Sequence, residues 1–199
     1  MIITSKLVWV HLPKTAGTTT DQLFVASGLN LLWHDSQFSS IKHLPPSEHP
    51  SRADLPIAGR QFATNFRRLP HWLLSNYHHK LQHMGLDLDP MPMRAGLFWR
   101  DRAQRWLPAD WWIDRFSIDE NWIFFRVEHL KRDFLSCLKT SEPIGRIARW
   151  RVRLVPGLNR SSYSRTLDTW FTSEDLQALY SANPLWASIE RKLYGDLLV

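Results

Sequence analysis

The chain has 199 residues, a formal net charge of +6 and a pI near 9.8, and 44% of its residues are hydrophobic, including 11 tryptophans. This composition excludes an intrinsically disordered chain and provides one sizeable core, so we expect a single domain over residues 1–199. The positive charge favours an anionic partner: a nucleotide, a polyanionic glycan, nucleic acid or a membrane surface.

The single cysteine and the short apolar runs limit the class further. Cys137 excludes an intramolecular disulfide framework and provides no metal cluster, and its apolar surroundings in the sequence predict a buried thiol. The N-terminal apolar run, Leu7–Val10, is four residues long. A membrane span needs roughly 20, so we expect no signal peptide, no transmembrane segment and a cytoplasmic location.

The first predicted strand, residues 6–11, leads into a loop with the features of an anion-binding site. Residues 7–20 read LVWVHLPKTAGTTT, in which Gly17 permits a tight turn before a predicted helix over 17–27. Such a turn directs backbone N–H groups and the positive end of the helix dipole toward one point. The loop is not the GxxxxGK(S/T) nucleotide loop, because Lys14 precedes the only glycine.

The middle of the chain predicts a short extended piece near 30–34, a strand over 60–67 and a helix over 70–84. Pro70 suits the start of this helix, and Gly85 suits its end. Spacings of three and four residues place four side chains on one apolar face: Leu74, Tyr77, Leu81 and Met84.

The remaining pattern alternates helices and strands. The predicted elements are a helix over 95–106, a strand over 122–127, a helix over 130–139 and C-terminal helices near 172–181 and 184–193. This alternation predicts an α/β fold with a central, mainly parallel sheet flanked by helices. Ligands of such sheets bind at the carboxyl ends of the strands, where Lys14 and Arg68 both fall.

Four segments resemble the sulfotransferases that use 3′-phosphoadenosine 5′-phosphosulfate (PAPS). The strand–PKTAGT–helix segment resembles their 5′-phosphosulfate loop, and Arg68, Pro70 and Ser75 fill the places of a second signature. FRVEHLKRDF at 125–134 and LNRS at 158–161 resemble two further segments. The chain is thus similar to small bacterial members of the carbohydrate-sulfotransferase-like branch, and the resemblance implies a three-layer P-loop-like fold.

The resemblance also implies a set of donor-binding residues and no metal. They are Pro13, Lys14, Thr15, Ala16, Gly17, Thr18, Thr19, Arg68, Ser75, Asn159, Arg160 and Ser161. Lys14 would stabilise the leaving group as charge develops on its bridging oxygen. Arg68 and Ser75 would bind the 3′-phosphate. The alternatives are that Lys14 only attracts anions from the surface and that the threonines only cap the helix.

Transfer to a hydroxyl requires a base, and histidine suits this role near neutral pH. His43, in SIKHLPPSE, is the predicted catalytic base, because the family places a Lys-His pair between the two donor-binding segments. The alternative is that His43 packs or caps a loop, and His11 is the rival base. His79 and His83 have a spacing that suits a metal, but a solvated helix face explains them better.

Two Arg- and Trp-rich regions remain. Five tryptophans and five arginines lie within 93–122: Trp99, Trp106, Trp111, Trp112, Trp122, Arg94, Arg100, Arg102, Arg105 and Arg115. They suit the stacking of sugars and the binding of anionic groups in an acceptor cleft, although burial in the core is the alternative for at least half of the tryptophans. The second region places four arginines around Trp150, and it suits the nucleotide, the acceptor or a solvated face: Arg146, Arg149, Arg151 and Arg153.

Three residues depart from the family pattern. Leu69 stands where Asp or Asn is usual and Leu73 where Arg is frequent, so a charged contact near the 3′-phosphate is missing and a lower affinity for the donor is expected. Thr20 stands where an apolar residue is common, which removes no group that the chemistry needs. We expect sulfuryl transfer from PAPS to a hydroxyl, with a glycan as the expected acceptor and no nucleic-acid partner. The main alternative is a catalytically impaired homologue that binds a nucleotide or polyanion. A kinase that needs Mg²⁺ and a non-enzymatic nucleic-acid binder remain open.

Overall fold

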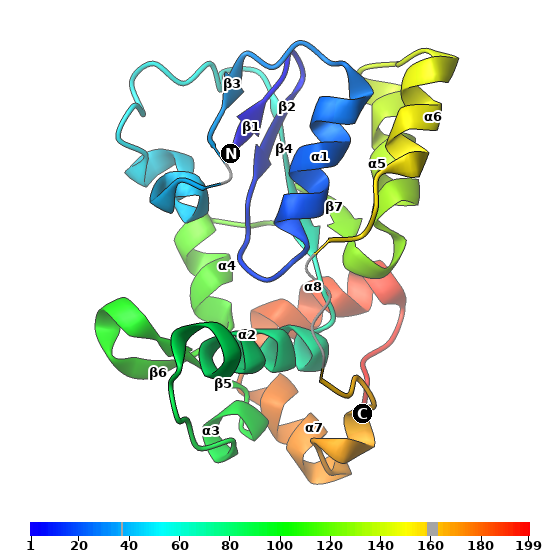
Figure 1. The fold of residues 1–199 in the computed structure, drawn as a ribbon. Coiled ribbons are helices and arrows are strands. Elements are labelled where there is room, and N and C mark those ends of the chain that lie inside the picture. The colour runs from blue at the N-terminus through cyan, green and yellow to red at the C-terminus, as the bar shows by residue number, and fades with distance from the viewer. Residues whose placement is uncertain (37, 159–162) are drawn as a thin grey trace. The chain divides into compact units, whose positions relative to one another are not determined.

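The computed structural model describes residues 1–36, 38–158 and 163–199 (Figure 1). The chain forms two compact units, each assembled from two segments. Unit 1 comprises Met1–Phe66 and Asp119–Arg160, and unit 2 comprises Arg67–Ile118 and Ser161–Val199. Among the described residues, no helix is both long and apolar enough to cross a bilayer.

Unit 1 contains a mixed five-stranded sheet with the order β3-β1-β2-β4-β7. Its strands are β1 (Ile2–Ile3), β2 (Leu7–Val10), β3 (Trp33–His34), β4 (Gln61–Phe66) and β7 (Ile123–Arg126). Strands β2, β4 and β7 are parallel, and β1 pairs antiparallel with β2 and β3. The predicted α/β class and the predicted strands are confirmed, and β1 is an additional short strand.

Helices of unit 1 pack on one face of this sheet (Figure 1). They are α1 (Gly17–Ser27), α5 (Leu130–Ser141) and α6 (Arg146–Leu154). Unit 1 also contains three short 3-10 turns: η1 (Ser40–His43), η2 (Pro46–Glu48) and η4 (Val127–His129). Trp9 of β2 packs against Phe24 of α1, which contacts Phe134 of α5 with ring centroids 4.9 Å apart. Cys137 lies in this core, as predicted.

The opposite face of the central strands is also buried, since Val8 and Val10 have no exposed surface. A strand that is buried on both faces needs a nearly continuous apolar sequence. This requirement explains why β2 consists of four consecutive apolar residues. The carboxyl ends of β2, β4 and β7 lie at one edge of the sheet. The loop that follows β2 therefore occupies the position where parallel sheets bind ligands.

Unit 2 is mainly helical. Its elements are α2 (Leu69–Met84), α3 (Met91–Arg94), β5 (Leu97–Arg100), η3 (Asp101–Ala103), β6 (Arg105–Pro108), α4 (Asp110–Phe116), η5 (Leu167–Thr169), α7 (Ser173–Ser181) and α8 (Pro184–Tyr194). Helix α2 ends at Gly85, which has a φ of 63°, as predicted. The predicted apolar face is confirmed for Leu74 and Tyr77, which are buried, but wrong for Met84, which is 46% exposed.

The predicted helix over 95–106 is wrong. Residues 97–108 form the antiparallel hairpin β5–β6, in which Trp99 pairs with Trp106 at a ring-centroid distance of 5.6 Å. Each strand has four residues, which is too short for a clear alternation, while cross-strand aromatic pairs of this kind stabilise a hairpin. Gln104 makes the turn in a left-handed conformation with a φ of 48°.

Candidate functional site

The loop between β2 and α1 has an unusual backbone. Lys14 and Ala16 both adopt the left-handed region, each with a φ of 63°. This conformation costs a non-glycine residue about 1 kcal/mol or more and is common at ligand-binding sites. Alternating left-handed residues form concavities of N–H groups that bind anions, and α1 begins directly after this loop, with Ala16 as its N-cap residue. The backbone therefore suits a phosphate or sulfate group.

Gly17 has a different role from the one that the sequence indicates. Its φ is not positive, so the left-handed turns are made by Lys14 and Ala16 instead. A Cβ atom on Gly17 would lie 1.7 Å from Nε2 of His11. The glycine is therefore required by the close approach of this imidazole, and the prediction that it makes the turn is wrong.

His11 is a packing residue. Its side chain is 9% exposed and lies between the Trp9 ring, 5.3 Å away, and the His43 ring, 4.3 Å away. Burial, followed by the nearby His43, lowers the pKa of His11 well below 6.5. A neutral ring enclosed in this way is poorly placed to accept a proton from a bound molecule.

His43 has a defined tautomer. Its Nδ1 lies 3.1 Å from the carbonyl oxygen of His11 and must donate, because a carbonyl only accepts. The lone pair of neutral His43 is therefore on Nε2. The pKa of His43 is lowered to about 4, mainly by burial; the hydrogen bond to the His11 carbonyl raises it, and the charges of Lys42 and Lys14 contribute to the lowering. At neutral pH His43 is thus an uncharged imidazole with a fixed proton acceptor.

The two lysines make this part of unit 1 electropositive. Lys14 and Lys42 both act electrostatically on His11 and His43, so the four side chains share one small region. Sequence reasoning noted Lys42 only as the neighbour of His43. An anion bound here would meet two ammonium groups and the positive end of α1.

A buried asparagine that the sequence analysis missed holds the loop in place. Asn65 of β4 has no exposed surface, and its Nδ2 donates to the Thr15 carbonyl and to Thr20 Oγ1, each at 2.6 Å. Trp9 Nε1 donates to Asn65 Oδ1 at 3.0 Å. Because these contacts fix Thr15 between the two left-handed residues, Asn65 positions the backbone of the candidate site.

This network explains the polar residue at position 20. The Thr20 hydroxyl accepts from Asn65 and lies 3.3 Å from the Ala16 carbonyl, to which it donates. A valine here would fill the same space but would leave the asparagine amide without one acceptor. The polar residue at position 20 is therefore coupled to Asn65.

The late segment LNRS begins beside the loop. The N–H of Leu158 donates to Thr19 Oγ1 at 3.2 Å, which connects this segment to the first turn of α1. The predicted site residues Asn159, Arg160 and Ser161 lie outside the described residues. Pro13, Thr15, Ala16, Gly17, Thr18 and Thr19 all lie in the loop or in the first turn of α1.

Arg68 belongs to unit 2, where it precedes α2 as the N-cap residue. Its guanidinium is 2.6 Å from Asp196 and 3.6 Å from the buried Glu190, and it lies 4.3 Å from the centre of the Tyr194 ring. The Asp196 side chain is 65% exposed, whereas that of Glu190 has no exposed surface. The predicted role of Arg68 stays a prediction, and its two carboxylate partners are residues that sequence reasoning missed.

Glu190 already supplies negative charge at the start of α2. Its carboxylate accepts from the Leu69 N–H and from the Tyr180 hydroxyl, both at 2.7 Å. Burial and the nearby Glu190 raise the pKa of Tyr180 well above 10, so this hydroxyl stays a donor. Ser75 is also buried, and it lies about 10 Å further along α2.

The segment FRVEHLKRDF has a structural explanation. Nε and Nη2 of Arg126 donate to the two oxygens of Asp133 at 2.8 and 2.9 Å, and the Arg126 N–H donates to the same carboxylate at 3.1 Å. Burial raises the pKa of Asp133, but the hydrogen bonds from Arg126 outweigh it and hold the pKa below its usual value. This pair fixes the turn from β7 into α5.

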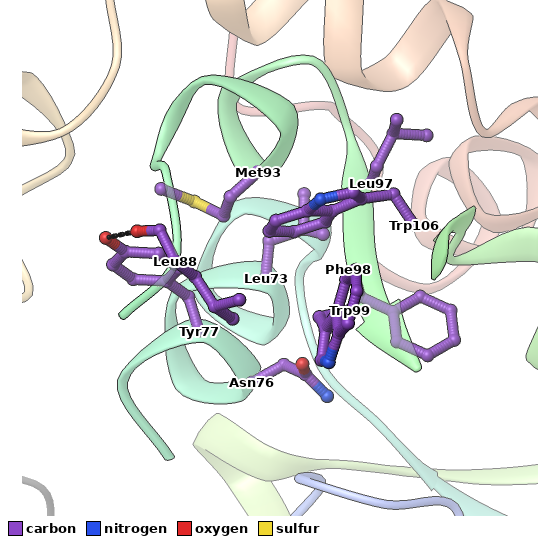
Figure 2. Close-up of a pocket in the computed structure, with 9 residues that line it drawn as sticks. All are labelled: Leu73, Asn76, Tyr77, Leu88, Met93, Leu97, Phe98, Trp99 and Trp106. Carbon is purple, nitrogen blue, oxygen red and sulfur yellow. Dashed lines mark hydrogen bonds between the residues drawn. The ribbon is translucent and has the colours of Figure 1, made fainter. Parts of the chain in front are cut away.

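The region predicted to bind the acceptor contains a small pocket in unit 2 (Figure 2). Trp99 and Trp106 line it, together with side chains of α2 and α3, and the Tyr77 hydroxyl donates to the Leu88 carbonyl at its rim. The pocket leaves almost no free volume for a water-sized molecule. Ligand pockets usually measure roughly 300–1,000 Å³, so this pocket alone does not hold a carbohydrate acceptor.

The neighbouring tryptophans and arginines form a stacked group. The Arg100 guanidinium lies 3.7 Å from the centre of the Trp111 ring, and that of Arg115 lies 5.0 Å from it. Of the five tryptophans in this region only Trp112 is fully buried, and the other four are partly exposed. Burial in the core, the alternative for at least half of these tryptophans, is thus found for Trp112 and only in part for the other four.

The described residues contain no group of three or more His, Cys, Asp or Glu side chains that could hold a metal ion. His79 and His83, whose spacing suits a metal, have ring centroids 5.0 Å apart. Comparisons with models of known protein families, with curated proteins and with solved structures found no match to this chain.

Proposed function

We propose that the protein is a PAPS-dependent sulfotransferase with a P-loop-like, three-layer fold, and that a carbohydrate hydroxyl is its acceptor. The observation that supports this most is the loop after β2, where the left-handed Lys14 and Ala16 precede the start of α1 and where His43 presents an unprotonated Nε2. The same unit thus contains an anion-binding backbone, two lysines and a neutral base.

Each group has a defined task in an in-line displacement. The acceptor oxygen attacks sulfur, the bond from sulfur to the bridging oxygen breaks, and its electron pair remains on the nucleotide 5′-phosphate. Lys14 stabilises that charge, as the N–H groups of the loop do for the phosphosulfate oxygens. His43 Nε2 takes the proton that the acceptor hydroxyl loses.

The resemblance assigns the 3′-phosphate to Arg68 and Ser75. Asp196 is an exposed side chain close to the C-terminal end, so a dianionic phosphate can replace it on the Arg68 guanidinium. Glu190 remains in place because its hydrogen bonds to Leu69 and Tyr180 are internal to unit 2.

The first test is calorimetric titration with adenosine 3′,5′-bisphosphate, the nucleotide product, with 5′-AMP as the control ligand. We expect binding that depends on the 3′-phosphate and that falls at least tenfold in Arg68→Ala, since a charge-assisted pair contributes about 1.5–3 kcal/mol. Arg191→Gln, which removes an exposed arginine of α8, is the matched control. Equal binding of both nucleotides would contradict this donor assignment.

The catalytic step is tested separately by turnover of PAPS with a panel of carbohydrate acceptors. Lys14→Ala should remove turnover while the free energy of unfolding stays close to that of the unchanged chain, because the left-handed backbone position accepts alanine no worse than lysine. Full turnover in Lys14→Ala would overturn the mechanism.

A second candidate is a catalytically impaired homologue that binds a nucleotide or another polyanion. The pairing of Arg68 with Asp196 and Glu190 favours it, because carboxylates occupy the guanidinium that a 3′-phosphate would need. This protein would bind anions at the β2–α1 loop without preference for the 3′-phosphate and would show no turnover with any acceptor.

A further inference from the structure

Helix α6 exposes a stripe of large apolar side chains. Ile147, Trp150 and Leu154 are 69%, 61% and 58% exposed. At about 3.6 residues per turn they lie along one side of the helix, nearly opposite Val152, which is fully buried in the core of unit 1. The buried side of α6, with Val152, therefore accounts for the packing of the helix on unit 1. The exposed stripe is a second apolar side, which this packing does not explain.

Arginines border the stripe on both sides. Helical geometry places Arg151 along one border and Arg146 with Arg153 along the other, and all three are exposed. The sequence of α6, RIARWRVRL, contains four arginines and no acidic residue. Its surface thus combines three apolar side chains with a strong local positive charge.

Backbone carbonyl groups near both ends of α6 accept hydrogen bonds from side chains of unit 1. The Arg149 Nε donates to the Ile144 carbonyl at 3.1 Å, and Lys131 Nζ donates to the Arg153 carbonyl at 2.7 Å. The helix is therefore anchored through Arg149, Lys131 and Val152, which lie away from the stripe. The exposed side is available without unfolding α6.

We propose that the exposed face of α6 binds the surface of a bilayer that contains anionic phospholipids. Ile147, Trp150 and Leu154 would enter the boundary between headgroups and acyl chains, and the flanking arginines would contact lipid phosphates. Interfacial helices combine these two features, an apolar face with an aromatic residue and cations along its borders. Nucleic acid matches the arginines and the tryptophan but offers nothing for an exposed isoleucine and leucine. This inference is independent of the proposed sulfotransferase activity.

The test is flotation of the full chain with vesicles of phosphatidylcholine alone and with vesicles that contain about a third phosphatidylglycerol. We expect binding to the anionic vesicles, little binding to the neutral ones, and a decrease in affinity as salt increases. Trp150→Ala should lower the affinity about tenfold, and the double variant Arg146→Gln/Arg151→Gln more than tenfold.

Two substitutions elsewhere serve as matched controls. Met91→Ala removes a side chain of α3 that is as exposed as Leu154, and Arg191→Gln removes an exposed arginine of α8. Both should bind vesicles like the unchanged chain, and thermal unfolding should show that all variants fold. Unaltered vesicle binding in the α6 variants would overturn the proposal. So would α6 variants that lose affinity for a labelled DNA oligonucleotide but keep their vesicle binding, since α6 would then be a nucleic-acid surface.

Discussion

His43 connects the candidate chemistry to the stability of unit 1. Burial lowers its pKa to about 4 in the folded protein, whereas a histidine in the unfolded chain titrates near 6.5. Between these values the unfolded chain binds a proton that the folded chain does not. The stabilising effect is therefore complete above about pH 6.5 and is lost as the pH falls toward 4.

We expect the free energy of unfolding to decrease by up to about 3 kcal/mol over this range because of His43 alone. His11, whose pKa is also lowered by burial, acts in the same direction. Urea denaturation at a series of pH values measures the effect, and His43→Asn should make the pH dependence shallower. His83→Asn, an exposed position on α2, is the control. The same pH dependence in all three proteins would contradict this assignment.

Asn65 gives a second prediction for a single residue. Asn65→Ala leaves the Trp9 Nε1–H and the Thr15 carbonyl without their buried partner, so we expect the free energy of unfolding to fall by about 2–4 kcal/mol. Thr20→Val removes the hydrogen bond from Asn65 and the longer one to the Ala16 carbonyl, and it should have the smaller effect, about 1 kcal/mol. Urea denaturation of both variants provides the measurement. An equal effect of the two substitutions would show that Asn65 does not organise the loop.

Residue roles of this kind are predictable only in part. The segment PKTAGT indicates the loop because the residues that form this loop are consecutive in the sequence. Asn65 and Glu190 could not be recognised, because their partners Thr15 and Leu69 are distant along the chain. The role of Gly17 was also hidden, since it depends on how closely the His11 ring packs.

At the scale of elements, the turn from β7 into α5 depends on the pair of Arg126 and Asp133. Arg126→Ala should lower the free energy of unfolding by about 1.5–3 kcal/mol, because it removes two charge-assisted hydrogen bonds to a largely buried carboxylate. Arg126→Lys keeps the charge but loses the paired geometry, so its effect should be intermediate. Denaturant unfolding tests the order of the three proteins, and a lysine variant as stable as arginine would contradict the importance of the paired contact.

The elements that were predicted correctly have strong local patterns. Strand β2 is four apolar residues, and α2 is bounded by Pro70 and Gly85. The sequence predicts a helix where the β5–β6 hairpin lies, because the contact of Trp99 with Trp106 stabilises the hairpin across its strands and leaves no pattern in the local sequence. Propensity is a weak guide for such short strands, since tertiary contacts decide their conformation.

At the scale of the whole molecule, the predicted site residues are divided between the two units. Lys14 and His43 belong to unit 1, whereas Arg68 and Ser75 belong to unit 2. Variants of Lys14 and Arg68 therefore examine the proposal in two different compact units. A loss of nucleotide binding in both, with normal unfolding, would be hard to explain by damage to a single core.

The order of strands in the sheet has a consequence for synthesis. Strand β4 pairs with β7 in parallel, yet residues 67–118 of unit 2 separate them along the chain. While the ribosome produces this stretch, one edge of β4 has no neighbour to accept its hydrogen bonds, and exposed edges of apolar strands promote aggregation. Closing so long a loop also slows the pairing step. The nascent chain is therefore expected to need chaperone protection until β7 has left the exit tunnel.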